Sequence, residues 1–348
     1  MKQKEIFGRK FFELSGSIHN HSIYSYDSNV PIKTIVEAAR KSSLDYFTLN
    51  DHFSVGAAKD EYLKKVKDIT IIVGSEIYDK AKNNHLLVYN SEKIYVNKDA
   101  KYYLKKYKEE DAICLVAHPI EKRKPKPYRK YPWSYGFSKD IDGIEIWNYS
   151  SMWLDKVRPK LNGLLLIFFP WLSITKPYKE TLKLWDKFSQ RKKIVAFGSS
   201  DAHGTIIKRL FMKIPVLKHS QIMKSIRTNV LIEEGMPINQ ATILQGIVKG
   251  NSYIVNYNLG NPFDFYSGIC KKNGNGIIPG ESLDFEEGLK LFFKLPKIAN
   301  VKLVYNGKII KKISEDKGYF EIKKSGRYRL EITRYSLGWI YTNNFYIK

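Results

Sequence analysis

Two closely spaced pairs of residues, of types that commonly bind metal ions in proteins, give the clearest chemical signal in this 348-residue sequence. His19 and His21 are separated by one residue, and Asp201 and His203 have the same spacing. On an extended backbone, residues two apart point to the same face, so each pair can offer two ligands to one ion. One such pair alone means little, because a single histidine near a strand end is more often a hydrogen-bonded structural residue.

Further candidate ligands lie at the ends of other apolar, β-rich runs. They are Asp51, His52, Glu76, His85 and His118, so six of the seven histidines fit one pattern. Histidines and carboxylates without a partnered cysteine are the ligands of hydrolytic zinc, manganese or iron sites. His219, next to a lysine at a helix start, is interpreted as a surface residue.

The elements that must position these residues alternate between strand and helix, which predicts an α/β fold with a mainly parallel sheet, open or closed into a barrel. Predicted strands cover residues 11–18, 44–49, 70–73, 86–89, 113–117, 141–146 and 194–197. Predicted helices cover 31–41, 99–108, 176–190 and 239–249. In a barrel of parallel strands the strand ends meet on one rim, which would gather the candidate ligands.

The pattern changes after Gly260-Asn261-Pro262 to short alternating strands, at 289–295, 301–305, 309–313, 319–322, 328–333 and 341–347. Asn306-Gly307 is a strong hairpin signal, and Asp316-Lys317-Gly318 and Lys324-Ser325-Gly326 predict further turns. We therefore predict a domain of residues 1–262 and a small sandwich-like, all-β domain of residues 263–348. No residue of the second domain indicates catalysis.

The net charge of +24 favours anionic substrates such as phosphate esters, although a lysine-rich composition can also simply maintain solubility. The densest basic patch, residues 122–130, lies beside Tyr128, Tyr131 and Trp133. Nucleic acid is therefore a possible partner, but no base-recognition motif supports it. The two cysteines, Cys114 and Cys270, lack the spacing of a disulfide framework or a zinc site.

The N-terminal residues lack the apolar core of a signal peptide, so we expect a cytoplasmic protein. The longest apolar run, Leu164 to Ile174, is about half as long as a bilayer span and contains Pro170, so no membrane span is expected. A lid, a dimer contact and a membrane-surface element are alternatives for this run, and a packed helical hairpin is the preferred interpretation. The sequence predicts no oligomeric state.

The ordered motifs resemble the polymerase and histidinol phosphatase (PHP) superfamily over roughly residues 12 to 260. The motifs are His19-x-His21, Asp51-His52, Gly74-Ser75-Glu76, His85, Val116-Ala117-His118-Pro119 and Ser200-Asp201-Ala202-His203. This resemblance implies a distorted (β/α)7 barrel, a site for two or three divalent ions (zinc, manganese or iron) and, most commonly, phosphoester hydrolysis.

The resemblance also implies three sets of ligands. His19, His21, Glu76 and Asp201 would hold a first ion, Glu76, His85 and His118 a second, and Asp27, His52 and His203 a third. Many relatives have an acidic residue where this chain has Tyr26, so Asp27 is the ligand of the third set whose spacing departs from the family's pattern. Asp51 is expected either to be a further ligand or to support one.

Catalytic roles beyond metal binding are expected for Glu76, Asp201 and His203. Arg209 is the first candidate for a phosphate-binding arginine, followed by Arg158 and Arg123, because guanidinium groups match phosphate oxygens.

A closer likeness connects residues 142–148, 164–171, 182–185 and 338–347 with the carbaryl-hydrolase-type branch of the superfamily. Hydrolysis of a carboxylic ester or aryl carbamate is therefore the alternative to hydrolysis of a phosphate ester. For Glu145 and Asn148, a place in the pocket and a role in packing are expected equally. Ser199 and Ser200 lack a nucleophile-elbow motif and are interpreted as loop-shaping residues.

The leading hypothesis is a metal-dependent phosphoesterase that uses a metal-bridging hydroxide as the nucleophile on a small anionic ester. A metal-stabilised binding module without catalysis is the alternative from another class.

Overall fold

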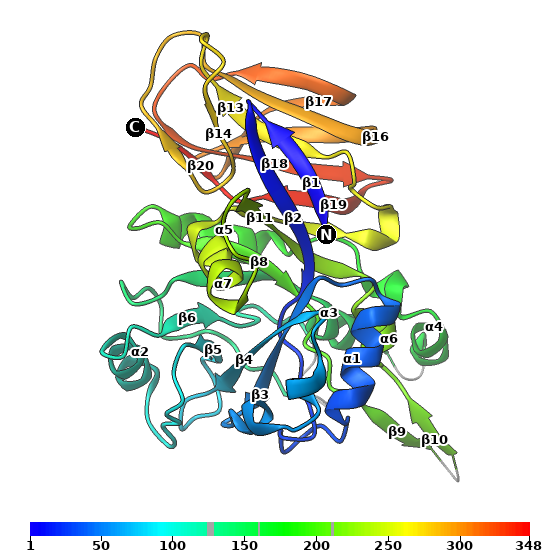
Figure 1. Cartoon of the computed structure of the whole chain (residues 1–348). Coiled ribbons are helices and arrows are strands. Elements are labelled where there is room, and N and C mark those ends of the chain that lie inside the picture. Colours follow the sequence, from blue (N-terminus) through cyan, green and yellow to red (C-terminus); the bar gives the residue numbers. More distant parts are fainter. Residues whose placement is uncertain (124–128, 159–160, 210–211) are drawn as a thin grey trace.

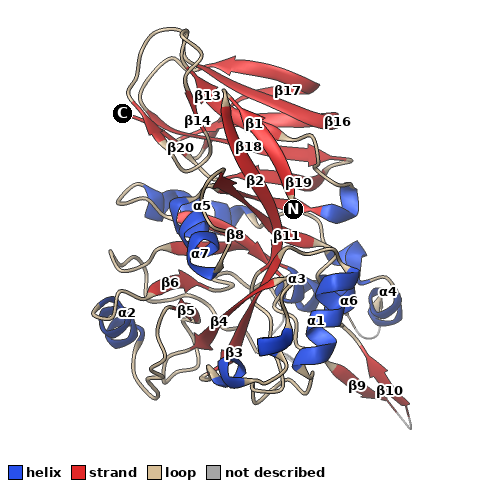
Figure 2. Ribbon diagram, viewed as in Figure 1, coloured by secondary structure: helices blue, strands red, loops and turns tan. Residues whose placement is uncertain are grey.

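The computed structural model describes residues 1–123, 129–158, 161–209 and 212–348, and side chains of residues 207–214 lie outside this description. It shows a large mixed sheet with helices packed around its N-terminal part (Figures 1 and 2).

The helices are α1 (Ile32–Lys41), α2 (Ala100–Lys108), α3 (Tyr149–Lys156), α4 (Gly163–Phe168), α5 (Lys179–Ser189), α6 (His219–Ile222) and α7 (Gln240–Lys249), with 3-10 turns η1 (Gly56–Lys59), η2 (Leu63–Lys65), η3 (Pro170–Ser173) and η4 (Tyr257–Leu259). The N-terminal strands are β1 (Lys2–Ile6), β2 (Arg9–Ser17), β3 (Tyr46–His52), β4 (Thr70–Ile77), β5 (Leu86–Tyr89), β6 (Ile113–Val116), β7 (Gly143–Asn148), β8 (Val195–Ser199), β9 (Ile206–Arg209), β10 (Met212–Pro215), β11 (Ile226–Glu233) and β12 (Ser252–Asn256). The C-terminal strands are β13 (Tyr266–Cys270), β14 (Gly276–Ile277), β15 (Ser282–Leu283), β16 (Lys290–Tyr305), β17 (Lys308–Glu321), β18 (Gly326–Arg334), β19 (Leu337–Thr342) and β20 (Phe345–Ile347).

The strands from β2 to β8 pair in chain order, but not all in parallel. The pairs β2–β3, β3–β4, β6–β7 and β7–β8 are parallel, whereas β5 is antiparallel to both β4 and β6. The connection of residues 78–85 is too short for the crossover that a parallel β4–β5 pair would need. The expectation of a mainly parallel sheet is therefore wrong: β1–β2, β2–β11 and β11–β12 are antiparallel as well, and the sheet is mixed.

Backbone contacts join the first and last strands of this series. Beyond the end of β8, the Ser200 amide donates to the Ile18 carbonyl at 3.0 Å, and the His21 amide donates to the Ala202 carbonyl at 2.9 Å. Asn20 and Ala202 form a parallel bridge. Residues directly after β2 and β8 are thereby held side by side, which brings the two His/Asp pairs together.

Helix α7 closes one end of the core that these strands enclose. Its N-terminus has a capping box in which the Asn239 side chain accepts from the Thr242 amide and Thr242 bonds back to Asn239. Gly250 ends the helix in the left-handed conformation that favours glycine. The buried face of α7, including Ile243 and Ile247, packs against apolar side chains of β2, β3, β4 and β8.

The predicted C-terminal strands are longer in the structure than expected. β16 spans both predicted strands at 289–295 and 301–305, and the turn predicted at Asp316-Lys317-Gly318 lies inside β17. The pairing passes from Lys294–Lys317 directly to Ala299–Glu315, so residues 295–298 bulge out of β16. Pro296 lies in this bulge, where its missing N–H is tolerated, and the strand continues past it.

Several other elements were not predicted, including strands β1, β9, β10, β11 and β12 and helix α3. The N-cap of α3 is Asn148, whose side chain accepts from the Ser151 amide. β12 pairs with β19, so the sheet continues across residues 260–262. Tyr253 of β12 packs in one apolar cluster with Trp339 and Ile340.

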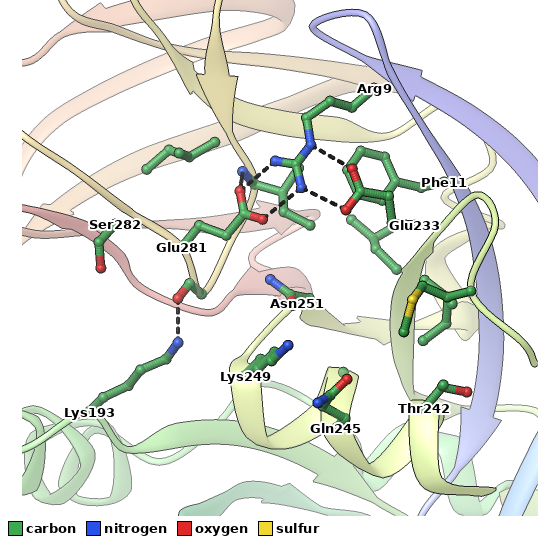
Figure 3. Close-up of a pocket in the computed structure, with 17 residues that line it drawn as sticks. Arg9, Phe11, Lys193, Glu233, Thr242, Gln245, Lys249, Asn251, Glu281 and Ser282 are labelled. Atoms are coloured by element: carbon green, nitrogen blue, oxygen red, sulfur yellow. Dashed lines mark hydrogen bonds and ion pairs between the residues drawn. The ribbon is translucent and has the colours of Figure 1, made fainter. Parts of the chain in front are cut away.

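Ion pairs also connect the N-terminal and C-terminal parts of the chain (Figure 3). The Arg9 guanidinium donates to Glu233 of β11 at 3.0 Å and to both carboxylate oxygens of Glu281, at 2.7 and 2.9 Å. These residues border a cavity of about 600 Å³ whose floor includes Gln245 and Lys249 of α7. Among the described helices, none is both long enough and apolar enough to cross a membrane.

Candidate metal centre

The Glu76 carboxylate lies at the centre of the predicted ligands and faces two separate groups of imidazoles. Its Oε2 atom is 3.0 Å from His19 Nε2 and 3.2 Å from His21 Nε2. Its Oε1 atom is 2.7 Å from His85 Nδ1 and 3.0 Å from His118 Nε2. Glu76 is the penultimate residue of β4 and is almost fully buried. A carboxylate placed in this way can bridge two metal ions.

Asp201 completes the first group. Its Oδ1 atom lies 3.4 Å from His19 Nε2 and 3.5 Å from His21 Nε2. The ligand atoms of these three residues and Glu76 all lie within 4.8 Å of one another. Two imidazoles and two carboxylates at this spacing are compatible with one divalent ion.

A third group surrounds Asp27. Its Oδ2 atom is 3.2 Å from His52 Nε2 and 3.2 Å from His203 Nε2. The His203 ring stacks on the His21 ring at a centroid distance of 3.9 Å, which joins this group to the first. All nine predicted ligands are thus neighbours in one cluster: His19, His21, Asp27, His52, Glu76, His85, His118, Asp201 and His203.

Buried nitrogen atoms without partners show that these residues fit a cation. His21 Nε2 and His52 Nδ1 are buried and have no hydrogen-bond partner among the described residues, although each points to within 3.4 Å of Glu76 Oε2. Buried polar atoms in native proteins normally have a partner, and leaving one without costs about 1–3 kcal/mol. Ions between these nitrogens and the carboxylate would satisfy both.

The charge states of Glu76 and His85 suit metal binding. Burial opposes the charge on Glu76, but the surrounding histidines, His19 first, outweigh it and hold the pKa of this carboxyl well below its ordinary value. Burial lowers the pKa of His85 to about 4, and the nearby Glu76 carboxylate only partly offsets this. At neutral pH His85 is therefore uncharged and keeps a lone pair for a ligand role.

The backbone φ is positive, not extended, at three ligands. φ is 66° at His19, 53° at Asp201 and 24° at His118, and β2 ends before His19. The extended geometry that we assumed for the His19–His21 pair is therefore wrong, and a bend at His19 brings the two rings together instead. Such a conformation costs a non-glycine residue about 1 kcal/mol or more. Here the Asp201 amide fixes the bend by donating to the His19 carbonyl at 2.7 Å.

Glu145 and Asn148 lie directly behind the ligands. Glu145 Oε1 is 3.0 Å from His19 Nδ1, and its Oε2 accepts from the His118 amide at 2.5 Å and from Asn148 Nδ2 at 2.9 Å. Asn148 Nδ2 also lies 3.2 Å from Asp201 Oδ2. For Glu145 and Asn148, a pocket role and a packing role were equally expected. These contacts show that both side chains orient residues of the site.

Asp51 supports the site instead of entering it. Its carboxylate accepts from the Ser22 amide at 2.5 Å and from the Ser22 hydroxyl at 2.8 Å. Burial raises the pKa of Asp51, partly opposed by these hydrogen bonds. Both carboxylate oxygens thus hold the turn that follows His21.

The interpretation of His219 as a surface residue is wrong. Its side chain is buried, and Nε2 donates to the His21 carbonyl at 3.0 Å. Burial lowers the pKa of His219 to about 3, so the ring is neutral at physiological pH. The lysine beside it in sequence misled the prediction, because Lys218 lies just outside α6 while the helix turns His219 inward.

Ser199 and Ser200 face the interior. Both are fully buried, and Ser200 Oγ lies 2.6 Å from Ser17 Oγ. Neither contacts a histidine nitrogen among the hydrogen bonds of the described residues, which agrees with a role in shaping the loop.

The ligands open into a cavity of about 630 Å³. Its walls include residues that the sequence did not single out, namely Tyr78, Lys82, Trp153 and Leu154. Arg123 also lines it and is buried, with its amide donating to Asp155 Oδ1 at 2.8 Å and its guanidinium paired with Glu121.

Of the other two candidate arginines, Arg158 does not line this wall, and the side chain of Arg209 lies outside the described structure. Arg158 donates to the carbonyls of Asp155 and Val157, and Arg209 ends β9. The basic patch at 122–130 falls partly outside the described structure as well, since residues 124–128 are not described.

Comparison with known proteins supports the family resemblance for part of the chain. Residues 17–120 match the PHP domain. The matched segment runs from just before His19 to just past His118, and it leaves Asp201 and His203 outside. No curated protein matches the chain.

Several solved structures are similar in part. A two-domain protein from Bacteroides vulgatus containing a predicted PHP-like metal-dependent phosphoesterase is 17% identical, with 99% of each chain covered and a TM-score of 0.48. A structure from Bifidobacterium adolescentis, described as a candidate metal-dependent phosphoesterase, is 14% identical over 58% of this chain and 92% of its own, with a TM-score of 0.36. Endonuclease Q, in complex with a duplex substrate that carries an abasic lesion, is 16% identical over 77% of this chain and 65% of its own, with a TM-score of 0.42.

Because every TM-score is below 0.5, these likenesses do not decide the activity, which has to be inferred from the side chains themselves. The likeness to the carbaryl-hydrolase-type branch stays a prediction. What the comparisons and the structure share is a PHP domain match over residues 17–120 and a His/Glu/Asp cluster compatible with a metal site.

Proposed function

We propose that this protein is a metal-dependent phosphoesterase that hydrolyses a small phosphate ester at a site for two or three divalent ions. The observation that carries the proposal is the Glu76 carboxylate, whose two oxygens each face a different pair of histidines. A bridging carboxylate places two ions close together, which is the arrangement that phosphoester hydrolysis uses in two-metal enzymes.

In this proposal the nine clustered residues are the metal ligands, within a distorted barrel formed by β2 to β8 and followed by the β-rich domain predicted for residues 263–348. His19, His21, Glu76 and Asp201 hold one ion, Glu76, His85 and His118 a second, and Asp27, His52 and His203 a third. Divalent ions in these positions supply activated water at neutral pH and polarise a phosphoryl oxygen.

The chain itself contributes orientation and charge. Glu145 fixes the ring of His19, and Asn148 connects Glu145 with Asp201. Arg123 lies in the cavity wall with its head group held by Glu121, so it can present N–H groups to a bound phosphate. The net charge of +24 attracts an anionic ester toward the cavity.

The test combines metal analysis with hydrolysis of p-nitrophenyl phosphate, its diester and p-nitrophenyl acetate. We expect two or three ions per chain in the wild type. In Glu76→Gln we expect the bound ions to be lost, and phosphate ester cleavage to be lost with them. The matched control is Glu13→Gln, another buried carboxylate of the same sheet that contacts Lys4 and Tyr253 and no histidine. It should keep metals and activity.

Other outcomes would reject the proposal in defined ways. Turnover of the acetate alone, with metals bound, would favour the carboxylic ester or carbamate alternative. A protein that binds metal but cleaves none of the three esters would favour the metal-stabilised binding module, and one that binds no metal and cleaves nothing after addition of manganese would reject the hydrolase proposal.

A further inference from the structure

A group of exposed apolar side chains lies on α4 and η3. We call the following residues the apolar patch: Leu161, Leu164, Leu165, Phe168, Phe169, Trp171 and Leu172. Leu161 is 87% exposed, Phe168 66% and Trp171 46%. Seven large exposed apolar residues within twelve positions concentrate apolar surface in one short segment, and such surface marks interaction sites. α4 and η3 pack against each other as a helical hairpin would, but these apolar side chains face outward instead of into the core.

The patch belongs to an ordered element. Leu166 is buried beneath it, and the Leu166 carbonyl accepts from Trp153 Nε1 of α3 at 2.8 Å. The Asn162 side chain accepts from the Arg158 amide at 2.6 Å, and Ser173 Oγ donates to the Pro170 carbonyl at 2.7 Å. α4 lies at the edge of the molecule (Figures 1 and 2), so the apolar face points to the surroundings while its other side is anchored on α3.

The patch lies within a stretch of sequence whose charged residues are all basic, bordered by Asp155 and Glu180. Between residues 156 and 179 the sequence has no Asp or Glu, while Lys156, Arg158, Lys160, Lys176 and Lys179 occur there. Lys176 and Lys179 are exposed. An apolar face that carries Trp, Phe and Leu and is flanked by basic residues is the composition of an interfacial, membrane-surface element.

We propose that the apolar patch docks on an anionic lipid bilayer. Leu, Phe and Trp side chains enter the boundary between head groups and acyl chains, and the flanking cations pair with anionic head groups. This inference goes beyond the proposed catalytic function and does not depend on it.

Two other occupants fit the structure less well. A second copy of the chain would bring the same basic stretch and a net charge of +24 to the contact, so its approach would be opposed by like charge. The patch is also not a lid in its present position, because no described residue from 161 to 172 lines the metal cavity.

Docking would bring the lipid surface close to the metal cavity. Helix α3 anchors the patch through Trp153, and the same helix contributes Ser150, Trp153 and Leu154 to the cavity wall. The two surfaces therefore share one helix.

Tryptophan fluorescence gives a direct test. Of the six tryptophans, all within the described residues, Trp171 alone is exposed, and the other five are 7% exposed or less. With vesicles of equal parts phosphatidylcholine and phosphatidylglycerol, we expect the protein to sediment with the lipid and brominated acyl chains to quench Trp171. Vesicles of phosphatidylcholine alone should bind about tenfold less protein, and about 0.5 M NaCl should weaken binding to the anionic vesicles.

Three variants sharpen the test. Leu165→Ser/Phe168→Ser should reduce vesicle binding about tenfold or more, because two anchors are lost from exposed positions. The matched control Ile309→Ser/Ile310→Ser removes two exposed apolar residues from β17 and should bind as the wild type does. His19→Ala should also bind normally, which separates this inference from the catalytic proposal.

Three results would overturn the inference. They are equal binding to neutral and anionic vesicles, absence of binding to either, and a dimer in the wild type that Leu165→Ser/Phe168→Ser converts to a monomer. The last result would assign the patch to a second copy of the chain.

Discussion

The substitution Glu145→Gln tests how the residue behind His19 controls metal affinity. Oε2 of Glu145 accepts from two N–H donors, the His118 amide at 2.5 Å and Asn148 Nδ2 at 2.9 Å. Glutamine has only one oxygen, which must stay toward these donors, so its NH2 group would face His19 Nδ1. His19 would then accept a hydrogen bond at Nδ1 and carry its proton on Nε2, the atom that faces Glu76 and Asp201.

A protonated Nε2 cannot bind a metal ion, so the variant loses the tautomer that the site needs. Loss of such a supporting partner typically weakens metal binding 10- to 100-fold, which is about 1.4–2.7 kcal/mol. Because the wrong tautomer is enforced here, we expect the upper end of this range.

The assay is competition between the metal-free protein and a chelating dye for zinc or manganese, followed by phosphate ester hydrolysis across a metal titration. Activity should recover to within a few-fold of the wild type at saturating metal, since Glu145 supports a ligand and is not one. Glu331→Gln, a buried carboxylate bonded to Arg329 at 2.7 and 3.0 Å, serves as the control for loss of a buried charge. Unchanged metal affinity in Glu145→Gln, or an equal loss in Glu331→Gln, would refute the tautomer argument.

Three further predictions concern stability. Removing metals with a chelator should lower the melting temperature and adding manganese or zinc should restore it, because ions that bind only the folded state stabilise it; an unchanged melting temperature would argue against a resident metal. Gly16→Ala should destabilise the protein by about 1–3 kcal/mol in urea unfolding, because a Cβ at Gly16 would overlap the buried ring of Tyr46; a change within error would show that the ring can move. Burial raises the pKa of Tyr89 and of Tyr328 to about 12 each, so these tyrosines ionise first in the unfolded state as the pH rises through 10. Each tyrosine should therefore lower the free energy of unfolding by about 1 kcal/mol at pH 11, measured by urea unfolding. A free energy of unfolding that stays constant between pH 9 and 11 would contradict this.

The positions of the predicted ligands could be read from the sequence because strand ends carry them. Glu76, His52 and His118 each lie at or just past the end of a buried strand, and the fold brings such ends together. The sequence did not reveal the left-handed bend at His19, since this bend depends on a backbone hydrogen bond from Asp201, 182 positions away.

Contacts between distant segments also explain the other differences. His219 has the sequence context of a surface residue, and only the packing of α6 near the turn after His21 buries it. The long strand β16 was predicted as two strands because Pro296 normally interrupts pairing, but a bulge absorbs it. The apolar run at 164–174 has the composition of a buried segment, and composition alone does not reveal which side chains a neighbouring helix covers.

The backbone hydrogen bonds between residues 18–21 and 200–202 have a consequence for biosynthesis. The first histidine of the cluster leaves the ribosome long before its carboxylate partner Asp201 has been made. The bend at His19 cannot be fixed until β8 has been synthesised and has docked, so this group takes its final geometry only after the first two hundred residues have folded. Nascent or truncated chains that end before Asp201 would carry His19 and His21 without the backbone bond and the carboxylate that complete the group.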